Sequence, residues 1–101
     1  MSVCVILGNY TEQGIKDIKG SPERVRRVRK TIEDAGGKFI SFYYTMGQYD
    51  FVCIVEGDEA ALGALFLVGS RGNVRTQSMK GFTLEEAEPI IKSLNGGFHF
   101  A

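Results

Sequence analysis

The chain has 101 residues, of which 44% are apolar and 24% are charged, and its 12 basic and 12 acidic side chains cancel. This is the size and composition of one globular domain. The balanced charge argues against nucleic acid as a partner, because phosphate binding depends on an excess of Lys and Arg. No apolar stretch reaches the roughly 20 residues that span a bilayer, so a membrane is not expected either.

The N-terminus lacks the basic and apolar regions of a signal peptide, and we therefore expect a cytoplasmic protein. Cys4 and Cys53 both fall in apolar, strand-like runs and are expected to be reduced core thiols. We interpret residues 1–101 as a single domain with a core at residues 3–94 and a short C-terminal tail at residues 95–101.

The first half of the chain alternates between strand and helix signals. Residues 3–7 are a continuous apolar run rich in β-branched side chains, which is typical of a strand buried on both faces. Residues 9–20 contain two glycines and predict an irregular connection with one helical turn. Ser21 and Pro22 predict a helix start at which Ser21 caps the free amides. Apolar residues at helical spacing follow until the glycine pair at residues 36–37 ends the helix.

The hairpin and the second helix come next. Residues 38–46 and residues 51–55 predict two strands joined by a short turn, and therefore an antiparallel hairpin. Residues 60–68 are apolar all round and predict a helix that Asp58 caps. Gly63 inside this helix suggests the close approach of a neighbouring backbone.

The last two elements are a polar strand and a capped helix. Residues 74–82 are polar for a strand, which is typical of a sheet edge. Thr83 and Glu86 have the spacing of a capping box and open a final helix that ends near Leu94. Pro89 is a candidate kink in this helix.

This order of elements predicts an α+β ferredoxin-like fold, a βαββαβ antiparallel sheet followed by a C-terminal helix. Right-handed crossovers place both main helices on one face of the sheet, with the apolar strands at residues 3–7 and 51–55 in its centre.

The other face of the predicted sheet is then also apolar and has no cover within one chain. Leaving several large apolar side chains wet would cost about as much as the whole stability of a small domain. We therefore expect a homodimer or a higher homo-oligomer. The apolar second helix is covered either by the C-terminal helix or by further association of dimers.

The hairpin segment at residues 42–52, with Gly47, Tyr49 and Asp50, resembles the motif that names the GYD domain family. Further agreement lies at residues 9–15, 21–24 and 72–76, and the resemblance extends from residue 3 to about residue 94. It implies a dimeric α+β barrel and no particular activity. The same hairpin resembles the effector-binding domain of Lrp/AsnC-type regulators. Because no helix-turn-helix precedes it in this sequence, DNA binding does not carry over.

The sequence offers little for metal or cofactor chemistry. His99 is the single histidine, the two cysteines lack paired spacing, and no phosphate-binding glycine loop is present. We therefore expect neither a metal nor a cofactor. The basic cluster on the first helix is interpreted as a solvated helix face, since acidic residues offset it.

Polar residues at three places are candidates for a ligand site. Some follow a central strand, where ligand sites are common, and the alternative is an ordered loop. Others sit at the hairpin tip, where a role in closing the turn and the barrel end is favoured over ligand binding. One lies on the last strand, where edge exposure is favoured over a cavity. The candidate ligand-binding residues are Asn9, Tyr10, Thr11, Gln13, Tyr49, Asp50 and Arg75.

Two main hypotheses for function follow. The first is a homodimeric module that binds a small molecule in or beside the cavity between its two sheets. The alternative is a cofactor-independent oxygenase or isomerase, which needs a proton acceptor in the cavity. The acceptors on offer are Asp50, Glu12 and Tyr10, and none is clearly buried by its sequence context, which favours binding. A structural partner for another protein is a third option. Whether the protein is an enzyme stays open.

Overall fold

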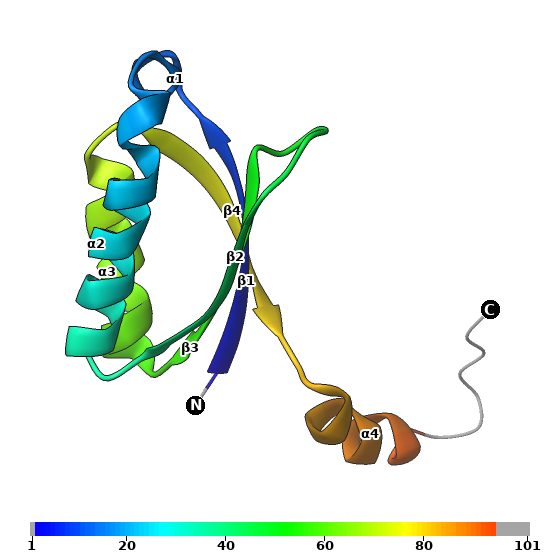
Figure 1. Ribbon diagram of the computed structural model, residues 1–101. Coiled ribbons are helices and arrows are strands. Elements are labelled where there is room, and N and C mark those ends of the chain that lie inside the picture. The colour runs from blue at the N-terminus through cyan, green and yellow to red at the C-terminus, as the bar shows by residue number, and fades with distance from the viewer. Residues whose placement is uncertain (1, 95–101) are drawn as a thin grey trace.

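The computed structural model describes residues 2–94 and consists of a four-stranded sheet with a layer of helices on one face (Figure 1). The strands are β1 (Ser2–Tyr10), β2 (Lys38–Tyr44), β3 (Phe51–Gly57) and β4 (Val74–Gly81). The helices are α1 (Glu12–Lys16), α2 (Ser21–Asp34), α3 (Glu59–Ser70) and α4 (Leu84–Lys92), with a 3₁₀ turn (Ile18–Gly20) between α1 and α2. The expected tail at residues 95–101, with His99, lies outside the described residues.

The strands pair antiparallel in the order β2-β3-β1-β4, which is the predicted α+β ferredoxin-like fold. The central positions of β1 and β3 and the edge position of β4 are confirmed. β1 is longer than predicted, because its residues from Gly8 to Tyr10 continue the ladder and pair with residues 74–76 of β4.

Alternate residues of the central strands face opposite sides of the sheet. Cys4, Ile6, Phe51, Cys53 and Val55 are buried beneath α2 and α3. The other side, which we call the open face, has only half-buried or exposed side chains. Its apolar residues come from all four strands and are Val3, Val5, Leu7, Tyr43, Val52, Ile54 and Met79.

The helix starts follow the sequence with one correction. Asp58 caps α3 by accepting a hydrogen bond from the Ala61 amide at 3.1 Å, and Thr83 and Glu86 form the predicted capping box of α4. The predicted capping role of Ser21 is wrong. The chain enters α2 directly from the 3₁₀ turn, with Gly20 and Ser21 already in the helical region, so no amide there needs a side-chain cap.

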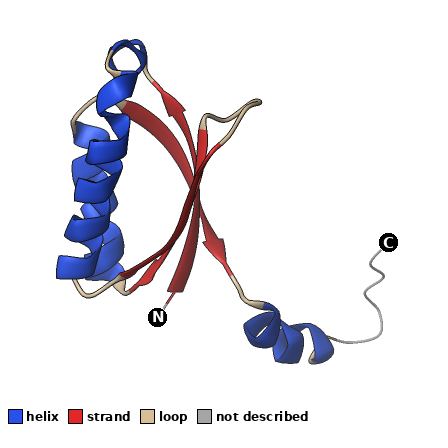
Figure 2. Ribbon diagram, in the orientation of Figure 1, coloured by secondary structure: helices blue, strands red, loops and turns tan. Residues whose placement is uncertain are grey.

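The C-terminal helix α4 lies beyond the sheet, on the side opposite α2 and α3 (Figure 2). None of its residues is buried within the chain. It therefore does not cover α3, whose Phe66 remains 83% exposed. Of the two alternatives for shielding α3, coverage by the helix of the same chain is wrong.

Gly63 lies in the middle of α3, and the expected close approach of a backbone there is also wrong, since a Cβ at this position would meet no atom within 4 Å. Gly14 in α1 is the opposite case, because a Cβ there would lie 2.0 Å from the Asn73 carbonyl oxygen.

We predict that Gly63→Ala raises the free energy of unfolding by about 0.5–1 kcal/mol, because alanine loses less backbone entropy than glycine on forming a helix. Gly14→Ala should lower it by at least about 1 kcal/mol, because the Asn73 backbone must move away. Urea unfolding of the two variants checks this. Equal effects of the two substitutions would contradict the glycine environments described here.

Candidate functional site

A cavity of about 180 Å³ lies between α2, α3 and the sheet. Its apolar walls include Ile6, Val28, Phe42, Phe51, Leu65 and Val74. Its polar lining consists of Tyr10, Ser21, Arg24, Arg27, Thr31, Arg71, Asn73 and Thr76. Both Arg27 and Arg71 are exposed, so the cavity opens to solvent beside them.

The cavity occupies one end of the helix layer only. It is lined by α2 from Ser21 to Thr31 and by the last part of α3. At the other end, small residues bring α3 down onto the sheet: Cβ atoms placed at Gly37 and Gly57 would come within 2.9 and 2.6 Å of the Ala61 Cβ. The larger side chains near the end of α3 fill the space less completely, and the gap remains there.

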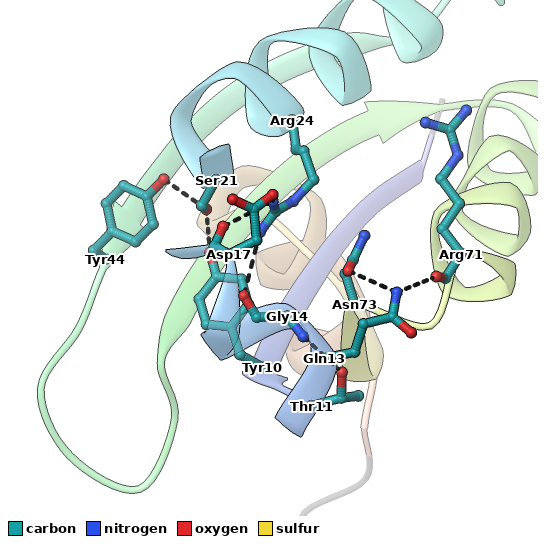
Figure 3. A network of polar contacts seen from close by, with 10 residues as sticks. All are labelled: Tyr10, Thr11, Gln13, Gly14, Asp17, Ser21, Arg24, Tyr44, Arg71 and Asn73. Carbon is teal, nitrogen blue, oxygen red and sulfur yellow. Dashed lines mark hydrogen bonds and ion pairs between the residues drawn. The ribbon is translucent and has the colours of Figure 1, made fainter. Parts of the chain in front are cut away.

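Three hydroxyl groups form a chain at one wall of the cavity (Figure 3). The Ser21 Oγ lies 2.5 Å from the Tyr10 hydroxyl and 2.9 Å from the Tyr44 hydroxyl. Ser21 is almost fully buried, so these bonds satisfy a group that would otherwise be costly to bury. Burial raises the pKa of the Tyr10 phenol, while its hydrogen bond with Ser21 acts in the opposite direction. Tyr10 therefore stays neutral near pH 7 and is a hydrogen-bonding group rather than a base.

Asp50 contacts the same tyrosine through the backbone. Its Oδ2 accepts a hydrogen bond from the Tyr10 amide at 2.9 Å, and its own amide donates to the Gly8 carbonyl at 2.8 Å. The carboxylate thus joins the β2–β3 hairpin to the end of β1. It serves an amide of the neighbouring strand instead of the turn amides that the sequence suggested.

Thr11 and Gln13 fasten the loop that follows α3. The Thr11 hydroxyl donates to the Gly72 carbonyl at 2.6 Å, and the Gln13 side-chain amide donates to the Arg71 carbonyl and to the Asn73 side chain. Both side chains are used in holding this loop against α1. They position one wall of the cavity without lining it.

Tyr49, Asn9 and Arg75 belong to the other side of the sheet. Asn9 and Arg75 are partners in the β1–β4 ladder and point to the open face, because their neighbours on each strand point to the helices. The Tyr49 hydroxyl donates to the Gln77 Oε1 at 3.0 Å, which brings the hairpin over that face. The structure therefore divides the sequence candidates between two faces, and among them Tyr10 lines the cavity.

The sequence did not predict that the arginines at the cavity are candidate ligand-binding residues. Arg24 is half-buried and held by Asp17, whose Oδ2 lies 2.9 Å from Nη1, and Figure 3 shows the Arg24 side chain directed from α2 toward Asp17. Arg27 and Arg71 form no ion pair with any carboxylate in the described part of the chain. The helical spacing of Val25 and Val28 predicted which side of α2 faces the core. No pattern in the sequence predicted that Arg71 would lie beside that side of α2.

The two cysteines are buried, free thiols on the helix side of the central strands, as expected for core residues. Burial, and to a smaller extent Cys4, raises the pKa of the Cys53 thiol to about 12. Although Cys53 lines the cavity, its thiol is neutral at physiological pH and is a poor nucleophile.

Within residues 2–94, no group of three or more His, Cys, Asp or Glu side chains could hold a metal ion. The described helices also include none with the length and apolar character needed to cross a membrane.

The fold and this cavity define a small α+β ferredoxin-like domain with a ligand-sized space beneath its helices. The model of the GYD domain matches residues 4–91, and the chain belongs to the GYD domain family. A relative from Thermus thermophilus, the glutamine synthetase and cystathionine beta-lyase binding protein, is 30% identical over 95 residues, which cover 91% of this chain and 100% of the relative.

Two solved structures share the fold. MtbAldR matches 81% of this chain and 53% of its own length with a TM-score of 0.61 and 16% identity. A candidate glycine cleavage system transcriptional repressor matches 81% of this chain and 46% of its own length with a TM-score of 0.50 and 14% identity. The chain thus spans about half the length of these structures, and at such identities the likeness shows the fold alone.

We predict that Asp50→Ala lowers the free energy of unfolding by roughly 1–3 kcal/mol, because the Tyr10 amide loses its partner. Asp50→Asn should cost clearly less, since its side-chain oxygen can accept the same hydrogen bond. Thermal and urea unfolding of both variants measure the difference. An equal loss in the two variants would show that the negative charge, and not the hydrogen bond to Tyr10, is what matters.

Proposed function

We propose that this GYD-domain protein is a homodimeric module that binds a small molecule in the cavity between α2, α3 and the sheet. The cavity itself is the observation that carries the proposal. Protein interiors are close-packed, and a space of about 180 Å³ beneath two helices forgoes many dispersion contacts. An engineered apolar cavity of about 150 Å³ is known to take up benzene, so a ligand of that class fits the size.

The location differs from the one that the sequence suggested. The hypothesis from sequence put the ligand in or beside the space between two sheets, whereas this cavity lies within one chain on the helix side. The second copy has another role in the proposal, which is to cover the open face. Burying each of its large apolar residues would contribute about 1.5–3 kcal/mol, and α4 lies on the same side of the sheet, where it can reach the second copy.

The chemistry of the lining supports binding over catalysis. An oxygenase or isomerase of the cofactor-independent kind needs a proton acceptor beside its substrate. Among the described residues, the cavity lining includes no carboxylate and no histidine. Tyr10 is kept protonated by its raised pKa, and Asp50 and Glu12 do not line the cavity.

A second candidate is the binding of another protein. The Thermus thermophilus relative is named for binding two enzymes, and by this similarity we propose protein binding as a function of this chain too. The observation that favours it is the apolar outer side of α3, with Phe66 83% exposed, together with the unburied α4. If the chain binds another protein through α3, Phe66→Ser should abolish binding of that protein in a pull-down experiment. The same variant should still bind small molecules in the cavity.

Occupancy of the cavity is tested by titrating the ¹⁵N-labelled protein with benzene and indole and following amide shifts by NMR. We predict shifts at Val28 and Val74, which lie on opposite walls. Thr76→Phe, which fills the cavity from the exposed edge strand, should reduce the affinity at least about tenfold. Its neighbour Gln77→Phe, on the other face of β4, is the matched control and should bind normally. Absence of any shift at these walls with benzene, indole and phenylacetate alike would overturn the proposed cavity site.

The homodimer is tested by sedimentation velocity at micromolar concentration. We predict a dimer for the natural chain and a folded monomer for Ile54→Lys, which puts a charge at the centre of the open face without touching the buried core. Lys19→Glu, an exposed change on the 3₁₀ turn, is the control and should remain dimeric. A natural chain that sediments as a monomer contradicts the proposal.

A further inference from the structure

We propose that the ligand of the cavity is a small aromatic carboxylate, with its ring between the helices and the sheet and its carboxylate at the mouth beside Arg27 and Arg71. This inference rests on the cavity site proposed above and adds the chemical class of the ligand. It is carried by three features of the lining, which are its charge, its aromatic walls and its hydroxyl chain.

The first feature is an uncompensated positive charge. The lining contains Arg24, Arg27 and Arg71, and no acidic residue among those described. Arg24 is already engaged, since its guanidinium bonds to the Asp17 carboxylate and also to the Asp17 carbonyl, each at 2.9 Å. Arg27 and Arg71 have no ion-pair partner in the part of the chain that the structure describes, so their donors are available for an anion.

The pairing pattern along α2 makes Arg27 stand out. The other exposed cations of this helix each have an acidic partner three or four residues away. These pairs are Arg26 with Glu23, Arg29 with Glu33, and Lys30 with Asp34. Arg27 lines the cavity and has no such partner within the described residues.

Arg71 approaches from the loop that follows the other helix. It follows the end of α3, and its main-chain carbonyl accepts the bond from Gln13 that fixes the loop. Figure 3 shows its side chain extending away from that loop, with no contact drawn to its guanidinium. Two exposed arginines from two elements, both lining one cavity, favour a carboxylate, whose planar oxygens match the planar donors of arginine.

The second feature is the aromatic content of the walls. The Phe42 and Phe51 rings are stacked with centroids 5.3 Å apart, and the Tyr10 ring is tilted against Phe51 at 5.6 Å. A ligand ring placed above them would add offset or edge contacts of the kind that aromatic pairs prefer. A branched aliphatic chain of the same volume would gain only dispersion.

The third feature is a spare hydroxyl hydrogen. Tyr10, Ser21 and Tyr44 carry three hydroxyl hydrogens and form two hydrogen bonds with one another. When the chain runs from Tyr44 through Ser21 to Tyr10, the Tyr10 hydrogen is left to point into the cavity. The wall can therefore donate one hydrogen bond to an oxygen substituent on the ligand.

The test compares three probes of nearly equal shape, phenylacetate, phenylacetamide and 2-phenylethylamine, by NMR titration of the full chain. Phenylacetate should bind about tenfold or more tightly than the amide, as expected for charge-assisted hydrogen bonds, and the ammonium probe should bind weakest. Arg27→Gln and Arg71→Gln should each lower phenylacetate affinity toward that of the amide. Arg26→Gln, an exposed change at the position before Arg27 that does not line the cavity, is the matched control and should leave it unchanged.

The outcomes separate this inference from the cavity proposal. If phenylacetamide binds as well as phenylacetate, or if Arg26→Gln weakens phenylacetate as much as Arg27→Gln does, the anion assignment is wrong while the cavity site stands. If none of the three probes, nor benzene or indole, shifts the amides of Val28 and Val74, the cavity proposal fails and this inference fails with it.

Discussion

The structure depends on one constraint: the sheet is apolar on both faces, and within residues 2–94 only two long helices pack on it, both on the same side. Right-handed crossovers place α2 and α3 together, so Ile6, Cys53 and Val55 are buried while Val5 and Ile54, one residue along, are not. The helix-side core holds the chain together. The homodimer that we propose would cover the open face, because an apolar sheet face of this extent is rarely left in water.

The helix layer meets a second constraint, since two helices cannot cover four strands evenly. At one end, Gly37, Gly57 and Ala61 allow α3 to approach the sheet closely. At the other end, α2 and α3 are held over Phe51 and Tyr10, whose rings fill the space only in part, and the cavity remains. The cavity is therefore a consequence of where small and large residues fall along the strands and helices. Its polar mouth comes from Arg27 on the exposed side of α2 and Arg71 just after α3.

Much of the fold could be predicted from the sequence, because periodicity and turn chemistry are local. Apolar runs gave the central strands, and Thr83 with Glu86 gave the cap of α4. Errors arose where tertiary contacts decide. Ser21 has a good cap residue's chemistry, yet its hydroxyl is taken by Tyr10 and Tyr44, which are distant in sequence. Tyr10 could be predicted as a site residue because it follows a central strand. The cavity and the place of Arg71 could not be predicted, because they depend on how α3 packs against β4.

The proposed ligand cavity and the proposed dimer contact use opposite faces of the same strands, so substitutions can test them separately. On β4, Thr76 lines the cavity, whereas its neighbour Gln77 receives the Tyr49 hydroxyl on the open face. A substitution at one of these positions changes one surface and leaves the other in place. Asp50 is the exception, because it holds the Tyr10 amide and carries the hairpin whose Tyr49 crosses the open face. A substitution of Asp50 would therefore disturb the Tyr10 side of the cavity and the open face together.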